Sequence, residues 1–288
     1  MDTRLEEYKG LEIEDDFWRY TENEDYLYFL ARELSVDDIL LTIGIGGRSI
    51  KYTGYVKELH ATSIDLEDVQ RFLFVSHDII PNIESYRKSK SINQRIMYEM
   101  IKKQMEVLEN VGRRINSAVT YPVVLNGCCL PYKPRVFDVV LIEQILPIVP
   151  EMAEEIMHKA GKAVKHDGKV LSDFFPPHVE LKDGVGLDRK FLDVAEIYRL
   201  TAEEFYNPKT LTFDMEKLNF ELKRVLSPKE YRKVFNNEIR WEKQTFKCHR
   251  ESEIKRLHEL AGLKITHVNE YTGGMVNAKC RMYVSKPK

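Results

Sequence analysis

The residues that point most directly to a chemical function are a group of glycines and an acid about 20 residues after them. The apolar run Ile39–Ile43 leads into Gly44-Ile45-Gly46-Gly47, and Asp65 follows in Ser63-Ile64-Asp65-Leu66, about 20 residues later. Glycines let a ligand lie against bare backbone, and a carboxylate can accept both hydroxyls of a ribose. The pattern predicts a binding site for an adenosine-containing cofactor.

Two further side chains could carry acid–base chemistry, because each follows a segment with the pattern of a strand. Glu143 follows the apolar run Phe137–Ile142, and His178 closes Phe174-Phe175-Pro176-Pro177-His178. An imidazole titrates near neutral pH and a carboxylate can accept a proton, so both are candidate catalytic bases. A helix-capping role for Glu143 and a surface position for His178 are the competing interpretations.

Strand and helix patterns alternate around these residues. Uninterrupted or β-branched apolar runs predict strands, and apolar residues three and four apart predict helices. The expected strands are 39–43, 61–64, 118–125, 137–142 and 169–174, the last entered by a turn at 166–168, then a final pair at 264–271 and 278–284. The expected helices are 49–59, 92–111, 150–164 and 251–261.

Three parts are expected along the chain. Residues 1–36 form an N-terminal helical segment, in which apolar residues of 27–34 have the spacing of an amphipathic helix. Residues 37–178 and 246–288 form the cofactor-binding core, and 179–245 interrupt it. Because the interruption shows helical patterns broken by Pro208 and Pro228, with few strand signals, we expect an inserted helical cap.

Composition narrows the class of protein. The 288 residues, 43% of them hydrophobic, suffice for one large α/β domain with an insertion or for two small domains. The net charge is only -2 and no basic patch stands out, so nucleic acid is not an expected partner. The apolar core of a signal peptide and any run long enough to span a membrane are missing, which predicts a cytoplasmic location without membrane association. The four cysteines lack metal-ligand spacing, which predicts reduced buried thiols and no metal.

Taken in order, the segments resemble the class I S-adenosylmethionine-dependent methyltransferases. Leu40–Gly46 stands where that family has an apolar strand, an acid and Gly-x-Gly, and Asp65 stands where an acid holds the ribose. The segment 126–132 is similar to the loop after the third strand, with Asn126 where an Asp commonly faces the adenine amino group. Phe137-Asp138-Val139-Val140 matches the fourth strand, and the resemblance covers 39–175 and 250–285.

The resemblance implies a fold and a cofactor. The fold is α/β, a Rossmann-like, mainly parallel seven-stranded sheet with helices on both faces, an antiparallel C-terminal hairpin and the inserted cap. The cofactor is S-adenosylmethionine, whose methyl group would pass to an O, N or C atom of a small metabolite. The implied cofactor-binding residues are Thr42, Gly44, Ile45, Gly46, Asp65, Leu66, Asn126, Gly127 and Ile142.

Two departures from the family pattern keep other functions open. Thr42 replaces the usual acid, which reduces the negative charge facing the cofactor and leaves room for a non-catalytic S-adenosylmethionine-binding module. Arg48 replaces the last family glycine and could either bind an anionic substrate or point to solvent. A nicotinamide-dependent oxidoreductase is the second alternative, although Ser49 occupies the place of its third glycine.

The substrate is expected to be a small molecule. Enzymes that methylate nucleic-acid amino groups carry Asn/Asp-Pro-Pro-aromatic after the fourth strand, where this chain has Glu143-Gln144. An aromatic N-terminal segment and the cap instead suggest a closed pocket. The candidate substrate-binding residues are Tyr20, Arg48, Tyr198 and Tyr206, although aromatic residues at helical spacing also suit a core. The long helix at 92–111 or the cap could support a homo-oligomer.

Overall fold

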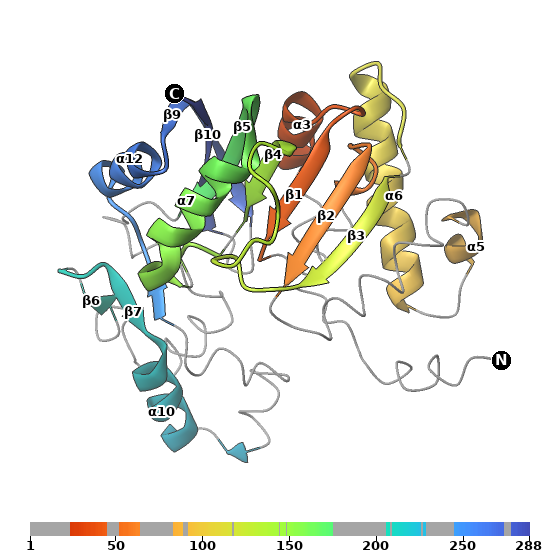
Figure 1. The fold of residues 1–288 in the computed structure, drawn as a ribbon. Coiled ribbons are helices and arrows are strands. Elements are labelled where there is room, and N and C mark those ends of the chain that lie inside the picture. The colour runs from red at the N-terminus through yellow and green to blue at the C-terminus, as the bar shows by residue number, and fades with distance from the viewer. Residues whose placement is uncertain are drawn as a thin grey trace.

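The fold is built on one seven-stranded sheet (Figure 1). A computed structural model of the chain describes residues 24–44, 52–63, 83–88, 92–116, 118–143, 145–147, 149–174, 206–207, 209–225, 227–228, 245–273 and 278–288. The strands are β1 Ile39–Ile43, β2 Glu58–Ser63, β3 Val119–Val124, β4 Phe137–Ile142, β5 Val164–Phe174, β9 Leu263–Gly273 and β10 Ala278–Pro287. Their order is β3-β2-β1-β4-β5-β10-β9.

Strand direction separates the two halves of this sheet. The pairs among β1 to β5 are parallel, whereas β10 runs antiparallel to both β5 and β9. The order 3-2-1-4-5 is that of a doubly wound Rossmann sheet. The prediction of a Rossmann-like, mainly parallel seven-stranded sheet with an antiparallel C-terminal hairpin is therefore confirmed.

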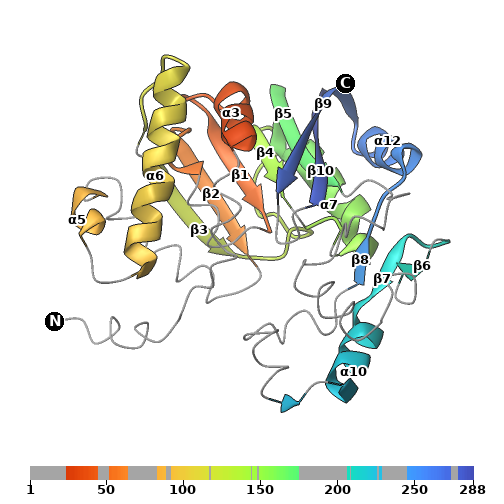
Figure 2. The ribbon, with the colours of Figure 1, turned by 180° about the vertical axis from the view of Figure 1, so that it is seen from behind.

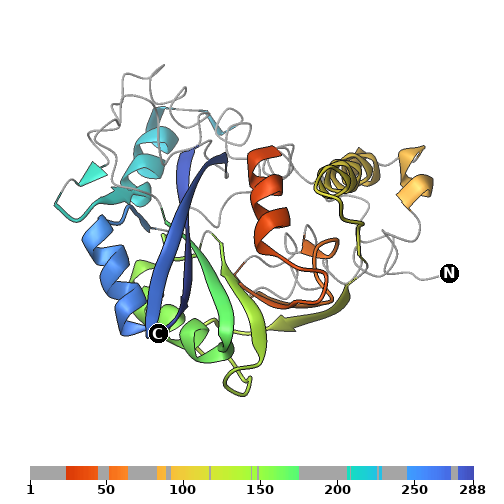
Figure 3. The same cartoon turned by 90° about the horizontal axis from the view of Figure 1, so that it is seen from above.

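Helices cover both faces of the sheet. α3 (Glu24–Glu33) and α6 (Ile92–Asn110) pack together on one face, and α7 (Ala153–Ala163) and α12 (Glu251–Leu260) pack together on the other. Figure 2 shows the first pair from behind, and Figure 3 shows the sheet between the two layers from above. A short helix, α5 (Ile83–Arg87), lies beside α6.

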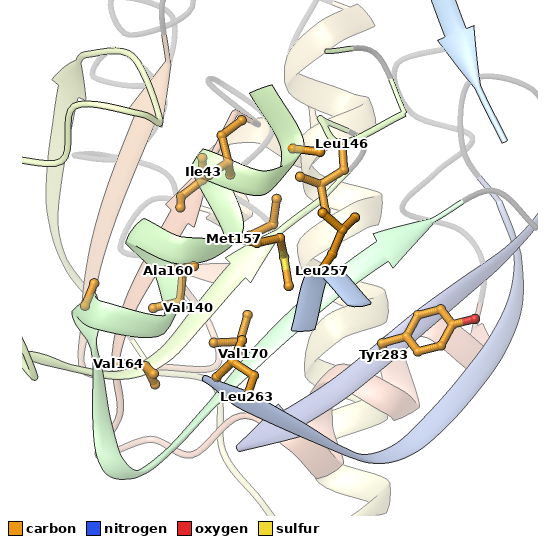
Figure 4. Packing of buried hydrophobic residues seen from close by; sticks show 14 of the residues in the cluster. Ile43, Val140, Leu146, Met157, Ala160, Val164, Val170, Leu257, Leu263 and Tyr283 are labelled. Atoms are coloured by element: carbon orange, nitrogen blue, oxygen red, sulfur yellow. The ribbon is translucent and has the colours of Figure 1, made fainter. Parts of the chain in front are cut away.

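The core between the sheet and α7 explains the patterns of the central strands. β4 is buried along nearly its whole length, because helices cover it on both faces. Met157 and Ala160 of α7 pack against Val140 and Val170 of the sheet and Leu257 of α12 (Figure 4). The predicted amphipathic N-terminal helix is also confirmed: its apolar positions, Leu27, Leu30, Ala31 and Leu34, are all buried.

Two local predictions are wrong. The helix expected over 49–59 does not form in its described part, because 52–57 make turns and 58–59 already belong to β2. The N–H groups of Lys57 and Glu58 both bond to the Asp38 carbonyl, which directs the chain straight into the strand.

The turn expected at 166–168 instead lies within β5, which begins at Val164. The register between β4 and β5 shifts there, and a Cβ on Gly168 would lie 2.5 Å from the Asp138 carbonyl oxygen. This glycine allows two strands to approach closely and does not make a turn.

The inserted segment 179–245 contains strands as well as a helix. Its described part includes α10 (Met215–Val225), β6 (Tyr206–Asn207) and β7 (Thr212–Asp214), and β7 pairs with β8 (Thr245–Lys247) in a three-stranded antiparallel sheet. The described part of the segment therefore holds two short strands beside its helix. Figure 1 shows the unit beyond the end of the large sheet toward which the β1, β2 and β3 arrowheads point. The limits of the three predicted parts stay predictions.

Candidate functional site

The candidate site lies at the carboxyl ends of β1 and β4. The two strands are neighbours, but the chain leaves β1 toward β2 on one side and leaves β4 toward β5 on the other. Open α/β sheets bind ligands at such a switch point. Ile43 and Ile142 are in register, so Gly44 and Glu143 leave the sheet at the same level.

Gly44 closes the end of β1 with a backbone conformation that favours glycine. Its φ is +87°, and its N–H donates to the Thr62 carbonyl at 3.3 Å. A Cβ at this position would lie 2.9 Å from the Cβ and Cγ1 atoms of Ile145, which follows β4. The space that a side chain at position 44 would need is therefore filled by Ile145, and the end of β1 packs directly on the segment after β4.

A second predicted glycine supports the same end of β1. A Cβ on Gly127 would lie 2.7 Å from Cγ2 of Ile43, so the loop after β3 packs directly on the last residue of β1. The preceding Asn126 is exposed, and its Oδ1 accepts the N–H of Cys128 at 2.9 Å. This turn places Asn126 just beyond the carboxyl end of β3 (Val119–Val124), and its contact with adenine stays a prediction.

Two of the predicted cofactor residues lie inside the sheet. Thr42 is fully buried, and its hydroxyl donates to the His60 carbonyl of β2 at 3.5 Å. The Thr62 hydroxyl of β2 donates a hydrogen bond to the Thr42 carbonyl at 2.8 Å. Ile142 is fully buried in the cluster between the sheet and α7. Thr42 thus links β1 to β2 by hydrogen bonds. Ile142 packs in the core directly before Glu143 and supports the end of β4.

Glu143 accepts a hydrogen bond that the sequence did not suggest. Its side chain is only 4% exposed, and the hydroxyl of Tyr52, itself fully buried, donates to its Oε2 atom. The hydroxyls of Tyr52 and Tyr26 are 3.1 Å apart. Burial first, and then the charge of Glu143, raises the pKa of both phenols well above the ordinary value, so both stay protonated.

Asp173 brings a second carboxylate to this edge. It is 1% exposed near the end of β5, and its charge is among the causes that raise the pKa of Tyr26. Carboxylates from two neighbouring strands therefore act on one buried phenol of α3. Spacing could have identified Asp173 as an acid near a strand end, but nothing in the sequence connects it with Tyr26.

His249 is a further buried polar residue near the same edge. It is 1% exposed, its ring meets that of Phe174 edge-on at 5.0 Å, and within the described residues its Nδ1 has no hydrogen-bond partner. Burial lowers its pKa to about 4, so the ring is neutral. The Lys247 N–H donates to the Pro147 carbonyl at 2.8 Å, which holds this segment on the loop after β4.

The remaining predicted site residues are only partly placed. Tyr206 begins β6 in the small sheet. Several others lie outside the described residues, namely Tyr20, Ile45, Gly46, Arg48, Asp65, Leu66, His178 and Tyr198. Of the cysteines, Cys128 and Cys248 are buried thiols as expected, whereas Cys129 is exposed and that expectation is wrong for it. Burial and then the Glu155 charge raise the pKa of Cys128 to about 11.

The described ranges lack two features that would point to other kinds of function. No helix in them is long and apolar enough to cross a bilayer. No three His, Cys, Asp or Glu residues among them are grouped so that they could hold a metal ion.

Comparison with known proteins identifies the fold. No family model matches the chain, and no curated protein sequence matches it. An S-adenosylmethionine-dependent methyltransferase from Methanosarcina mazei matches in structure with a TM-score of 0.51 and 14% identity, over 90% of this chain and 96% of that one. A protein from Rhodobacter sphaeroides assigned as a Zn-dependent alcohol dehydrogenase also scores 0.51, with 13% identity over 96% of this chain and 95% of that one. The resemblance to class I S-adenosylmethionine-dependent methyltransferases is confirmed at the level of the fold.

Proposed function

We propose that the chain binds S-adenosylmethionine at the carboxyl ends of β1 and β4 and transfers its methyl group to a small molecule. The observation that carries the proposal is the glycine turn at Gly44 in a sheet whose β10 runs antiparallel between β5 and β9. A dinucleotide-binding Rossmann sheet continues instead with a sixth strand in the order 3-2-1-4-5-6. The turn supports an adenosine ligand, and the hairpin favours methyl transfer over hydride transfer.

The residues around the turn fit the parts of this cofactor. The glycine turn formed by Gly44, Ile45 and Gly46 would hold the methionine end, and Asp65 would accept the ribose hydroxyls. Asn126 and Gly127 would border the adenine, with Leu66 and Ile142 supporting it.

When bound, the cofactor supplies an already activated methyl group, so the protein's main tasks are to align the acceptor and exclude water. Glu143 or His178 would take a proton where the acceptor carries one.

The substrate class follows from what surrounds this edge. The small sheet with β6 and its Tyr206 lies beyond the carboxyl ends of the strands, where a cap would close over a small molecule. We assign Tyr20 and Tyr198 to the same lining, and Arg48 to an anionic group of the substrate. The low net charge supports a metabolite over nucleic acid, and the reduced-thiol composition supports a cytoplasmic location.

A calorimetric titration tests the cofactor assignment. S-adenosylhomocysteine is titrated into the purified protein, into Asp65→Ala and into protein saturated with NADH. We expect micromolar binding that is lost in Asp65→Ala and unaffected by NADH. Binding of NADH without binding of S-adenosylhomocysteine would establish the oxidoreductase instead. Cofactor binding without turnover across a broad metabolite panel would support the non-catalytic module.

A further inference from the structure

A buried carboxylate is fixed beside the glycine turn by residues from three separate segments. Glu143 follows β4, Tyr52 lies between β1 and β2, and Tyr26 belongs to α3. The Tyr52 hydroxyl donates to Glu143, and the Tyr26 hydroxyl lies 3.1 Å from that of Tyr52. All three side chains are at most 4% exposed. Because the three side chains are buried together, the Glu143 Oε2 atom has a fixed position and a fixed hydrogen-bond donor, the Tyr52 hydroxyl.

The position of this carboxylate relates it to the proposed cofactor site. The in-register pair Ile43 and Ile142 places Gly44 and Glu143 at one level, and Ile145 packs on Gly44. Residues 143 and 145 therefore flank the turn at which the ligand would lie. A charge at this place acts through protein rather than through bulk water, which strengthens its interaction with a charged ligand.

The presence of a glutamate at position 143, where a glutamine could make the same hydrogen bond, needs an explanation. A glutamine would accept the same hydrogen bond from Tyr52 without the cost of removing a full charge from water. Because both phenols stay protonated, the Tyr52 hydroxyl can donate to the carboxylate while its oxygen stays within hydrogen-bond distance of the Tyr26 hydroxyl. A hydrogen bond alone therefore does not account for a carboxylate at this position.

We propose that Tyr26 and Tyr52 hold the Glu143 carboxylate as a fixed negative charge by which the site selects positively charged adenosyl ligands over neutral ones. The inference rests on the proposed function. S-adenosylmethionine carries a sulfonium, whereas the product S-adenosylhomocysteine carries a neutral thioether. The same charge thus holds the cofactor and weakens retention of the product. Glu143 would be a specificity residue in the site, and Tyr52 and Tyr26 positioning residues that act through it.

Calorimetry with three ligands tests this selection. The ligands are S-adenosylmethionine, S-adenosylhomocysteine and sinefungin, in which an amine replaces the sulfonium. We expect the wild-type protein to bind both cationic ligands about tenfold more tightly than S-adenosylhomocysteine, a difference of about 1.4 kcal/mol. In Glu143→Gln the affinities for the cationic ligands should fall about tenfold, while the affinity for S-adenosylhomocysteine should change by less than about twofold.

The tyrosines supply a matched pair of variants. Tyr52→Phe keeps the carboxylate but removes its donor, so the preference for cationic ligands should shrink. Tyr55→Phe removes another buried hydroxyl of the same turn, one without a hydrogen-bond partner among the described residues, and should leave the preference unchanged. If Glu143→Gln does not fold, as judged by circular dichroism, this pair decides the question.

The outcomes separate the inference from the function on which it rests. Equal wild-type affinity for all three ligands would overturn the charge selection, as would an equal loss for all three in Glu143→Gln. An unchanged preference in Tyr52→Phe would overturn the positioning role. Failure of the wild-type protein to bind any of the three ligands would instead refute the proposed methyltransferase itself.

Discussion

The Cβ atom that Gly44 lacks would lie 2.9 Å from Cβ of Ile145. The two residues follow β1 and β4, the strands on either side of the switch point. Real Cβ atoms do not approach other carbons so closely, so any larger residue at position 44 must push the two strand exits apart. The turn that would receive the cofactor and the loop after β4 are therefore packed as one unit.

Gly44→Ala should reduce both stability and cofactor binding. The clash with Ile145 adds to the strain of φ +87°, so we expect a loss of about 2–4 kcal/mol in the free energy of unfolding. Urea denaturation measures this, and S-adenosylhomocysteine affinity should fall at least about tenfold. Gly112→Ala is the control, because Gly112 has φ +73° but open space around its Cβ position. Equal losses in the two variants would show that the contact with Ile145 is unimportant.

Stability should fall in mild acid because His249 is buried and neutral. Burial lowers its pKa from 6.5 to about 4. As the pH falls from 6.5 toward 4, the unfolded chain takes up a proton that the folded protein does not. The stability that His249 contributes is therefore complete above pH 6.5 and lost across this window, by at most about 3 kcal/mol.

Urea midpoints measured between pH 4 and 7 test this dependence. His249→Gln should flatten the profile, whereas His158→Gln, at an exposed position on α7, should not alter it. Part of the slope should remain in His249→Gln, because burial also lowers the pKa of His258. A profile that is the same in wild type and His249→Gln would contradict the prediction.

The sheet could be predicted because its strands are encoded locally. A strand covered on both faces, such as β4, must be apolar at nearly every position, and this is visible without tertiary information. Glycine patterns are more ambiguous. The sequence pattern predicts a turn at both Gly44 and Gly168, but the structure has a turn only at Gly44, whereas Gly168 permits a close approach to the Asp138 carbonyl within β5. One residue type serves both purposes, and only the neighbouring strand distinguishes them.

The candidate site was only partly predictable. Glu143 could be chosen because it directly follows a clear strand. Its contact with Tyr52 and Tyr26 joins positions far apart in the sequence, and hydrogen bonds between such segments leave no periodic signal. Both tyrosines fall in segments with helical patterns, where aromatic side chains suit a core equally well. His249 gives no signal either, because its contact with Phe174 joins positions far apart in the sequence.

Gly161→Ala should destabilise the protein although it introduces a better helix former. Alanine in place of an interior helical glycine usually stabilises by up to about 1 kcal/mol. Here the added Cβ would lie 2.3 Å from the Ala261 carbonyl oxygen, where α7 packs against the end of α12. We expect a net loss of about 1–3 kcal/mol in urea denaturation. A gain in stability would show that α12 can move away at little cost.

Arg113 should hold the N-terminal helix to the turns that precede β2. Its guanidinium donates to the carbonyls of Ala31 and Leu34 at 2.5 Å each, at the end of α3, and to that of Tyr55 at 3.1 Å. Three acceptors in different directions require the planar fork of arginine, and a lysine ammonium cannot reach them all. Arg113→Lys should therefore lower the free energy of unfolding by about 1–3 kcal/mol.

The effect should also be local, because the carbonyls that lose their donor terminate α3. Hydrogen exchange should show faster exchange of α3 amides in Arg113→Lys, with α12 amides unchanged relative to the global stability. Arg114→Lys, at the exposed neighbouring position, should alter neither quantity. Because Tyr26 belongs to α3, loosening this helix should also weaken the hydrogen bond to Tyr52 and reduce the preference for cationic adenosyl ligands. Unchanged α3 exchange in Arg113→Lys would mean that apolar packing alone positions the helix.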